Sequence, residues 1–188
     1  GFGDTLGIFT KTVGQVLLVH DADTLGYWAE KDLPLYMKDK VVTPEQGLAL
    51  MQFLDESTIS VAEDSELVIN RFIFDPDKFD RSTSLSMDSG RARFWVKKLK
   101  EYTRSEFKVK TKTMVAGVRG SDFVIEIGKD FAKVTAFGDT IIEVVPLADP
   151  QKPVLVNSNQ SAQVDEGKGV SPVQNVPPDV IQELKNEM

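Results

Sequence analysis

Cysteine is absent from the 188 residues of this chain, and histidine occurs only once, as His20. Without cysteine the chain can form no disulfide, no thiolate metal site and no cysteine nucleophile. One histidine cannot assemble a typical zinc site, and no nucleophile-elbow serine accompanies it. Since the sequence shows no set of nucleophile, base and oxyanion donors, we predict that the protein is not an enzyme.

Long apolar runs are lacking as well. The longest, residues 16–19 and 48–51, have the length of strands and fall far short of the ~20 residues that a membrane-spanning helix needs. No signal peptide is visible, because no charged segment is followed by an apolar one. The chain starts at Gly1 rather than at methionine, which is compatible with a leader that has been removed.

Positive charge is in the minority, since 22 Lys and Arg oppose 29 Asp and Glu for a net charge of −7. This balance disfavours nucleic acid as a partner. Nevertheless, nine cations against two carboxylates lie between residues 91 and 112. This segment could dock an anionic polymer or an acidic protein face, or it could be the solvated face of edge strands. The residues that we predict to contact a partner are Lys97, Lys98, Lys108, Lys110, Lys112, Trp95 and Arg119.

Alternation of apolar and polar residues indicates β-structure. Residues 107–113 place Phe, Val and Thr on one face and Lys on the other. The runs 122–127, 131–137 and 141–145 follow, separated by turns that contain glycine, which favours an antiparallel meander. We therefore predict an all-β domain over residues 13–147, a twisted two-sheet β-sandwich or roll of short antiparallel strands.

Both ends of the chain are predicted to lie outside this domain. Residues 1–12 are rich in glycine and are interpreted as an N-terminal arm. From residue 148 onward, repeated prolines interrupt any continuous element. We predict a Pro-rich, mostly irregular linker or tail over 148–188, in which 154–164 could add one strand and 179–186 a short helix.

The motif at residues 117–120 combines two glycines with an arginine. Gly117 and Gly120 allow positive φ or a close approach of two backbones. Arg119 could form a bidentate pair with a carboxylate, for which Asp122 is a candidate, or it could contact a ligand or partner. Gly117, Gly120, Asp122 and Phe123 are interpreted as a structural motif.

Three carboxylates, Asp75, Asp77 and Asp80, lie close together on a predicted loop. Oxygen ligands of this kind suit Ca²⁺, yet Asp80 and Ser86 replace the glycine and glutamate of an EF-hand loop. A solvated acidic loop is the favoured interpretation, with a calcium site as the alternative. No other cofactor is predicted.

Three stretches, in order, resemble the FecR domain family. Residues 47–67 are similar to its double strand, in which a loop of the Asp-Gly-Ser type corresponds to residues 55–57 here, and residues 90–96 resemble a strand that begins just after a glycine. Residues 107–123 resemble the family's pattern F-x-V-x-T-P-T-A-x-x-G-x-R-G-T-x-F. Lys112, Met114 and Ser121 depart from the usual Pro, Ala and Thr.

The resemblance covers roughly residues 13–145 and implies a bacterial protein that is exported to the periplasm or the cell surface, or secreted. The family is best known from sensors that relay a signal from an outer-membrane transporter to a sigma factor. It therefore implies an extracytoplasmic signalling or protein–protein interaction module whose partner is another protein or a polymer of the cell envelope. Two alternatives stay open: a carbohydrate-binding module that uses Trp28, Tyr27 or Trp95, and a structural subunit of a surface assembly whose neighbours are strapped together by the tail.

Overall fold

The computed structural model describes residues 4–21 and 25–188 and is mostly β, with 55% strand and 7% helix. The all-β part of the predicted fold class is thereby confirmed. The strands are, in chain order, β1 (Gly7–Val13), β2 (Leu17–Val19), β3 (Tyr27–Trp28), β4 (Pro34–Leu35), β5 (Lys40–Thr43), β6 (Leu48–Phe53), β7 (Thr58–Val61), β8 (Ser65–Asp75), β9 (Asp80–Val96), β10 (Arg104–Lys110), β11 (Met114–Val118), β12 (Ser121–Ile127), β13 (Phe131–Ala136), β14 (Ile141–Pro146), β15 (Val154–Asn157), β16 (Gln160–Asp165) and β17 (Gln174–Asn175). A 3-10 turn, η1 (Pro76–Lys78), and one helix, α1 (Pro178–Asn186), complete the fold.

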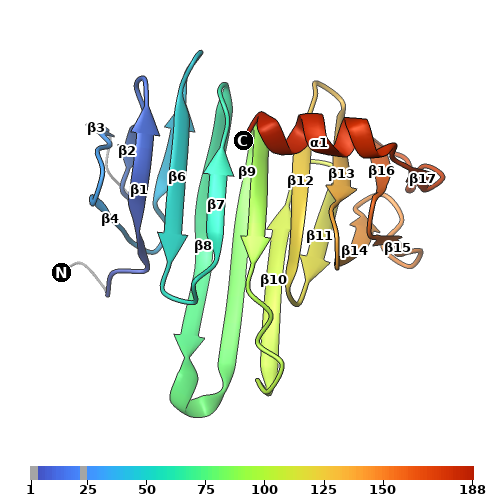
Figure 1. The fold of residues 1–188 in the computed structure, drawn as a ribbon, viewed down its shortest axis with the longest axis horizontal. Coiled ribbons are helices and arrows are strands. Elements are labelled where there is room, and N and C mark those ends of the chain that lie inside the picture. The colour runs from blue at the N-terminus through green and yellow to red at the C-terminus, as the bar shows by residue number, and fades with distance from the viewer. Residues whose placement is uncertain (1–3, 22–24) are drawn as a thin grey trace.

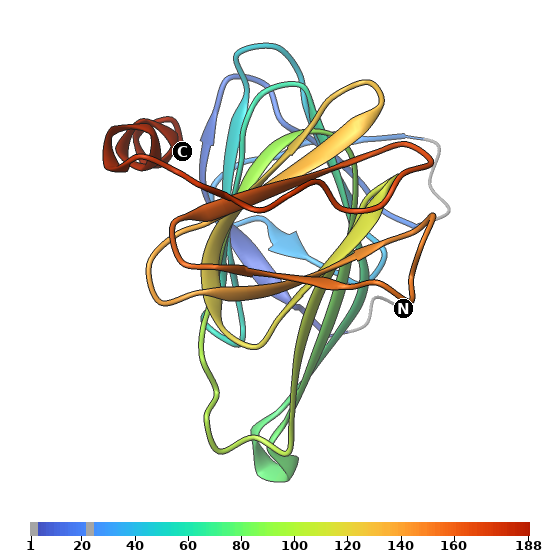
Figure 2. The same ribbon diagram turned by 90° about the vertical axis from the view of Figure 1, so that its right-hand side faces the viewer.

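The strands form one large mixed sheet that folds into two layers (Figures 1 and 2). Facing the viewer in Figure 1 is the front layer, with the pairing order β4-β1-β6-β7-β9-β12-β13-β16-β17. The back layer has the order β3-β2-β5-β8-β9-β10-β11-β14-β15. The predicted short, purely antiparallel strands were wrong in two respects: β9 spans 17 residues, and β9 and β10 pair in parallel.

Strand β9 belongs to both layers. Its first part pairs with β8 and β10 in the back layer, and its last part pairs with β7 and β12 in the front layer. The change occurs around Gly90, whose φ of 88° and close contact with Ser65 leave no room for a side chain. Gly90 therefore explains why the second family-like stretch begins just after a glycine.

The hydrophobic core fills the space between the layers. Alternate residues of facing strands point inward, and three phenylalanines meet there. Phe94 of β9 stacks on Phe123 of β12, with 5.1 Å between ring centroids, and contacts Phe107 of β10 at 6.2 Å. The two most family-like stretches of the sequence thus pack against each other at the centre of the protein.

The ends of the chain differ from the sequence prediction. Half of the predicted arm belongs to strand β1, which pairs with β4 and β6, while residues 1–3 lie outside the described part. Much of the predicted tail is also ordered, because β15 and β16 extend the sheet and bury Val156 and Val164. The prolines that suggested an irregular tail lie beside these elements or at the start of α1, where a missing N–H costs little.

Helix α1 lies across the outside of the front layer (Figure 1). Its single buried residue, Ile181, packs on Val124 and Phe137. Its bounds, Pro178–Asn186, nearly coincide with the predicted 179–186. Over residues 4–21 and 25–188, no helix is both long and apolar enough to cross a membrane.

Candidate partner-binding groove

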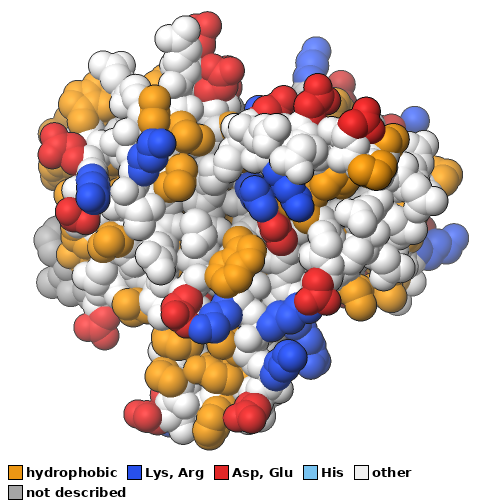
Figure 3. Space-filling model, viewed as in Figure 1, with side chains coloured by type: hydrophobic (Ala, Val, Ile, Leu, Met, Phe, Trp, Pro, Cys, Tyr) orange, Lys and Arg blue, Asp and Glu red, His pale blue; other side chains and the backbone are white. Residues whose placement is uncertain are grey.

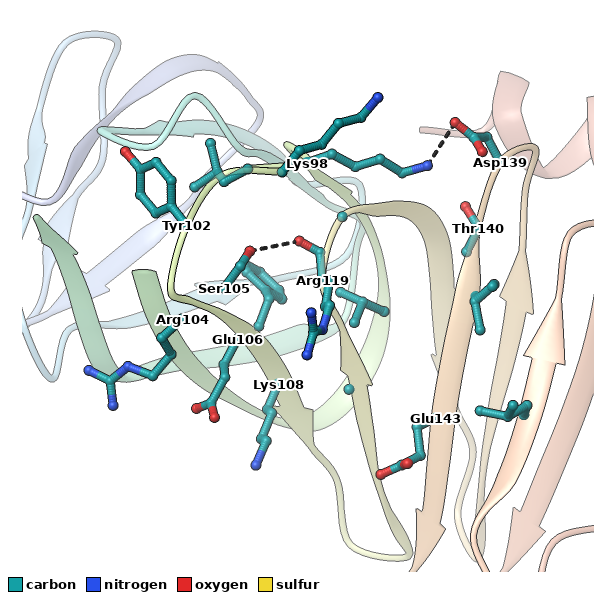
Figure 4. Close-up of a pocket in the computed structure, with 18 of the residues that line it drawn as sticks. Lys98, Tyr102, Arg104, Ser105, Glu106, Lys108, Arg119, Asp139, Thr140 and Glu143 are labelled. Atoms are coloured by element: carbon teal, nitrogen blue, oxygen red, sulfur yellow. Dashed lines mark hydrogen bonds and ion pairs between the residues drawn. The ribbon is translucent and has the colours of Figure 1, made fainter. Parts of the chain in front are cut away.

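A groove of about 980 Å³ crosses the outer face of the back layer (Figure 4). Strands β10, β11, β14 and β15 form its floor, because alternate residues of each strand point away from the core. The loop at residues 97–103 and the turn at 138–140 form its two sides. The residues of the floor that face the groove are Glu106, Lys108, Gly117, Arg119, Ile141, Glu143 and Leu155.

The two glycines of the 117–120 motif shape this groove in different ways. Neither adopts positive φ, so that part of the prediction was wrong. A Cβ on Gly120 would come within 2.6 Å of the Lys98 Cα, so Gly120 does serve a close approach of two backbones. A Cβ on Gly117 would meet nothing nearer than 3.9 Å. Gly117 pairs with Lys108 and Glu143 and leaves an open gap between these side chains in the floor.

Arg119 presents its side chain to the groove from a fixed backbone. Its carbonyl oxygen accepts hydrogen bonds from the Ser105 hydroxyl, at 3.1 Å, and from the Arg81 guanidinium. The Arg119 side chain is exposed and has no ion pair within the described ranges. Within residues 4–21 and 25–188, the structure therefore shows no carboxylate pair for Arg119, which was the first of the two roles left open by the sequence.

The suggested partner of Arg119, Asp122, pairs with Arg93 instead. The carboxylate accepts two hydrogen bonds from the Arg93 guanidinium, at 2.9 and 2.8 Å. This bidentate contact raises the pKa of Arg93 above its ordinary value. The pair lies on the outer face of the front layer, so Asp122 has no part in the groove.

Sequence analysis missed a fully buried ion pair behind the groove. Arg81 of β9 donates to Asp55 at 3.1 Å, and both side chains are 0% exposed. Asp55 also accepts from the Ser57 N–H and hydroxyl, each at 3.0 Å. Because Arg81 bonds to Asp55, Ser105 and the Arg119 carbonyl, it links the turn of the double strand to the groove. The polar turn at 55–57 within an apolar double strand was the one available signal.

The groove is cationic although the protein is acidic. Its lining contains the cations Lys98, Lys100, Arg104, Lys108 and Arg119 against the carboxylates of Glu106, Asp139 and Glu143. Within the described part of the chain, Lys100, Lys108 and Arg119 take part in no ion pair. Three cations are therefore available to an anionic ligand.

Two of the cations in the groove lining are held by carboxylates. Lys98 pairs with Asp139 at 2.7 Å across the top of the groove, which lowers the pKa of Asp139 (Figure 4). Arg104 pairs with Asp80 at 2.5 and 2.8 Å. Hydrogen bonding within this second pair lowers the pKa of Asp80 and raises that of Arg104.

The predicted partner-binding residues come together only in part. Lys98, Lys108 and Arg119 line the groove, whereas Lys97 pairs with Glu56 outside it. Trp95 lies on the outer face of the front layer with 47% of its surface exposed. The exposed Lys110 and Lys112 lie beyond the end of the groove.

Two of the three carboxylates of the suggested calcium site, Asp75 and Asp80, have separate structural roles, while Asp77 is exposed. Asp75 caps η1 by accepting from the N–H groups of Asp77 and Lys78, and Asp80 is bound to Arg104. Nowhere in residues 4–21 and 25–188 do three acidic or histidine side chains gather as metal ligands. Asp75 and Asp80 are thus engaged by groups of the chain itself, and the calcium site stays a prediction.

The aromatic residues suggested for sugar binding do not form one surface. Tyr27 and Trp28 are exposed on β3 at an edge of the back layer, far along the pairing order from Trp95. His20 lies beside Tyr27, with 5.5 Å between ring centroids, and its Nδ1 is 2.7 Å from buried Asp39. These contacts give His20 and Tyr27 a place in the packing of this edge.

The fold and the groove define a class of β-sheet protein with an open groove on the outer face of one layer. The FecR protein family matches residues 39–140, more than half of the chain, so this chain belongs to the FecR family. The match includes β9, the motif at 117–120, both sides of the groove and the floor strands β10 and β11, whereas the floor strands β14 and β15 lie beyond it. No protein of curated function matches this sequence.

Solved structures show the same fold. Two crystal structures of a proposed anti-sigma factor from Parabacteroides distasonis each superpose with a TM-score of 0.59. One is 16% identical and matches 76% of this chain and 62% of its own, and the other is 15% identical and matches 78% and 64%. The match spans less than two thirds of either solved chain.

Proposed function

We propose that this protein is an extracytoplasmic, non-enzymatic sensing or protein-interaction module whose partner binds in the groove of the back layer. The observation that carries the proposal is Arg119. Its backbone is held by Arg81 and Ser105, while its guanidinium is exposed and forms no ion pair with the described residues. An exposed arginine offers a bidentate contact to a carboxylate, and because its backbone is already fixed, binding has to order only the side chain.

Membership of the FecR family supports a role in sensing or regulation. The likeness to a proposed anti-sigma factor agrees with that role, although the shared feature is the fold. The family resemblance also supports a place outside the cytoplasm and a partner in the cell envelope. The chain would act there as a rigid surface that recognises a protein by charge and shape.

The composition of the groove supports binding rather than catalysis. Its central serine, Ser105, donates its hydroxyl to the Arg119 carbonyl, and His20 is not among the lining residues. A serine engaged in this way, with no histidine in the lining, does not match the arrangement that activates a hydroxyl nucleophile.

Affinity capture from the native envelope fraction tests the proposal. The wild-type protein should retain a specific partner protein, and Arg119→Glu combined with Lys108→Glu should lose it. Lys152→Glu is the matched control, because the Lys152 side chain is 82% exposed and lies outside the groove. A partner retained equally by all three proteins, or no partner at all, would reject the groove as the binding surface.

A carbohydrate-binding role is the second candidate. Trp28 and Tyr27 are 61% and 52% exposed, which is unusual for neighbouring aromatic residues in a sheet protein. Binding to a glycan array that is lost in Trp28→Ala and kept in Arg119→Glu would favour this role. The structural-subunit alternative expected the tail to bind neighbouring molecules. Strands β15 and β16 of this tail pair with β14 and β13 of the same chain instead, which does not support that alternative.

A further inference from the structure

The groove contains apolar side chains next to its cations. Ile141 of β14 and Leu155 of β15 are 61% and 57% exposed. Ile141 pairs with Asn157 and Glu143 pairs with Leu155, so the two aliphatic side chains are diagonal neighbours on the same face. Together they form a small aliphatic patch beside Arg119 and the gap at Gly117.

Each aromatic ring in the groove lining is in contact with other rings of the chain. Tyr102 is stacked parallel to Phe74, with 6.2 Å between centroids, and contacts Phe79 edge-on at 5.8 Å. Phe107 points into the core and is 2% exposed. Sugars are typically recognised by stacking on an aromatic ring, whereas branched aliphatic side chains suit the aliphatic side chains of a peptide. The lining therefore favours a peptide over a polysaccharide.

From these features we infer that the groove binds an extended segment of a partner protein in which carboxylates and aliphatic side chains occur together. The inference rests on the proposed function and specifies the chemistry of its partner. Carboxylates would bind Arg119, Lys108 and Lys100, and an aliphatic side chain would contact Ile141 and Leu155. The segment fits as an extended chain, because the strands from β10 to β15 are ~4.8 Å apart and the floor spans the length of about four extended residues.

The groove is prepared for such a ligand before binding. Its sides are joined by the Lys98–Asp139 pair, and the Arg119 backbone is held from below by Arg81. Gly117 leaves the floor open at its centre, where a peptide backbone or side chain can sit. Glu106 and Glu143 border this centre and would repel a ligand with carboxylates along its whole length. The groove therefore selects a mixed acidic and aliphatic segment over a uniformly acidic one.

Fluorescence anisotropy with defined probes tests this inference. The first probe is a labelled heptapeptide in which Glu or Asp alternates with Val or Leu. In the second probe Lys and Arg replace the acidic residues, and in the third Ser replaces the aliphatic residues. The fourth probe is polygalacturonate. We expect saturable binding of the first probe only. Its affinity should fall several-fold when NaCl is raised from ~50 to ~300 mM, because salt screens exposed charges.

Two groove variants and one control locate the binding. Arg119→Glu should weaken the first probe by about 10-fold or more, as expected when one charged contact is replaced by repulsion. Gly117→Leu should abolish binding while the circular dichroism spectrum and melting temperature stay unchanged, since its Cβ has room. Lys152→Glu should bind as the wild type does.

Several outcomes would overturn the inference. One is that the basic peptide, the serine-containing peptide or polygalacturonate binds as tightly as the first probe. Another is that the first probe shows no saturable binding up to ~1 mM. A third is that Gly117→Leu leaves the binding of the first probe unchanged. If affinity capture still finds a partner that depends on Arg119 and Lys108, the proposed function stands and only the chemistry assigned to the partner is wrong. If capture fails as well, both fall.

Discussion

Arginine and apolar side chains are covered around α1 on the outer face of the front layer and exposed on the outer face of the back layer. On the front face, Arg93 is bound by Asp122, and the ring of Phe137 is covered by Ile181 of helix α1. Side chains of both charges lie next to each other around the helix (Figure 3). On the back face, Arg119 forms no ion pair in the part of the chain that the structure describes, and Ile141 lies exposed beside it.

This difference indicates that the outer face of the back layer is the surface available to a partner. Arg91 of the front face pairs with Glu187 just beyond α1, and Arg93 and Lys185 lie 5.1 and 5.3 Å from the centre of the Phe137 ring. Around α1 the chain thus satisfies the charge and apolar surface of its front face internally, while Trp95 stays exposed on the same face. The back face keeps both unsatisfied within a groove, as a binding surface does.

The largest effect should come from the buried pair that supports the back face. Arg81→Met leaves Asp55 buried without its cation and should lower the free energy of unfolding by about 3–5 kcal/mol in urea titrations. Arg71→Met removes an exposed arginine from the neighbouring strand β8 and should change stability by less than about 0.5 kcal/mol. Equal effects of the two variants would show that the pair does not support the groove.

The two glycines of the groove should differ clearly. Gly120→Ala places a Cβ against the Lys98 backbone and should destabilise the protein by about 1–3 kcal/mol. Gly117→Ala points into open space and should lie within about 0.5 kcal/mol of the wild type. Thermal melts of both variants measure this, and a larger loss for Gly117→Ala would contradict the geometry of the floor.

On the front face, helix α1 should be held mainly by one side chain. Ile181→Ala should lower the free energy of opening of α1 by about 1–2 kcal/mol, because most of the apolar surface buried by Ile181 is lost. Hydrogen exchange of the helix amides measures this opening, and Val180→Ala, at a 37% exposed position, is the control. If faster exchange spread through the whole sheet, α1 would be part of the core rather than a cover.

The smallest effect concerns the pair Asp80–Arg104 at the edge of the groove. Arg104 holds the pKa of Asp80 below its ordinary value of 3.8, so ionised Asp80 favours the folded state above that pH. This contribution is lost as the pH falls through the lowered pKa. The stability difference between wild type and Asp80→Asn should therefore be present at neutral pH and shrink in acid. Urea titrations across this pH range measure the stability difference, with the exposed Asp77→Asn as control. A difference between wild type and Asp80→Asn that did not change with pH would show that the pair does not contribute.

The sequence predicted the elements whose side chains alternate. The predicted strands at 122–127, 131–137 and 141–145 nearly coincide with β12, β13 and β14, because apolar residues there face one core. Strand β9 was missed over its first half, where polar Ser82 and Thr83 are buried against the expectation for such residues. Strand β1 was missed because its glycines suggested a mobile arm, whereas Gly7 permits close contact with Gln52.

The candidate site was only partly predictable. The basic residues and Arg119 could be identified as candidates from charge and motif alone. Which carboxylate meets which arginine depends on strand register, so the pairs Arg93–Asp122 and Arg81–Asp55 could not be assigned. Nothing in the sequence indicated that Ile141 and Leu155 are exposed, because their place on the outer face of the back layer depends on strand pairing.

Photo-cross-linking in native cells tests the central claim, which is that the back face binds the partner and the front face does not. A benzophenone side chain would replace Ile141 in the groove or Trp95 on the front face, since both positions are exposed. The account predicts an adduct with one partner protein from position 141, lost with Arg119→Glu, and none from position 95. Adducts formed equally from both positions, or only from position 95, would contradict it.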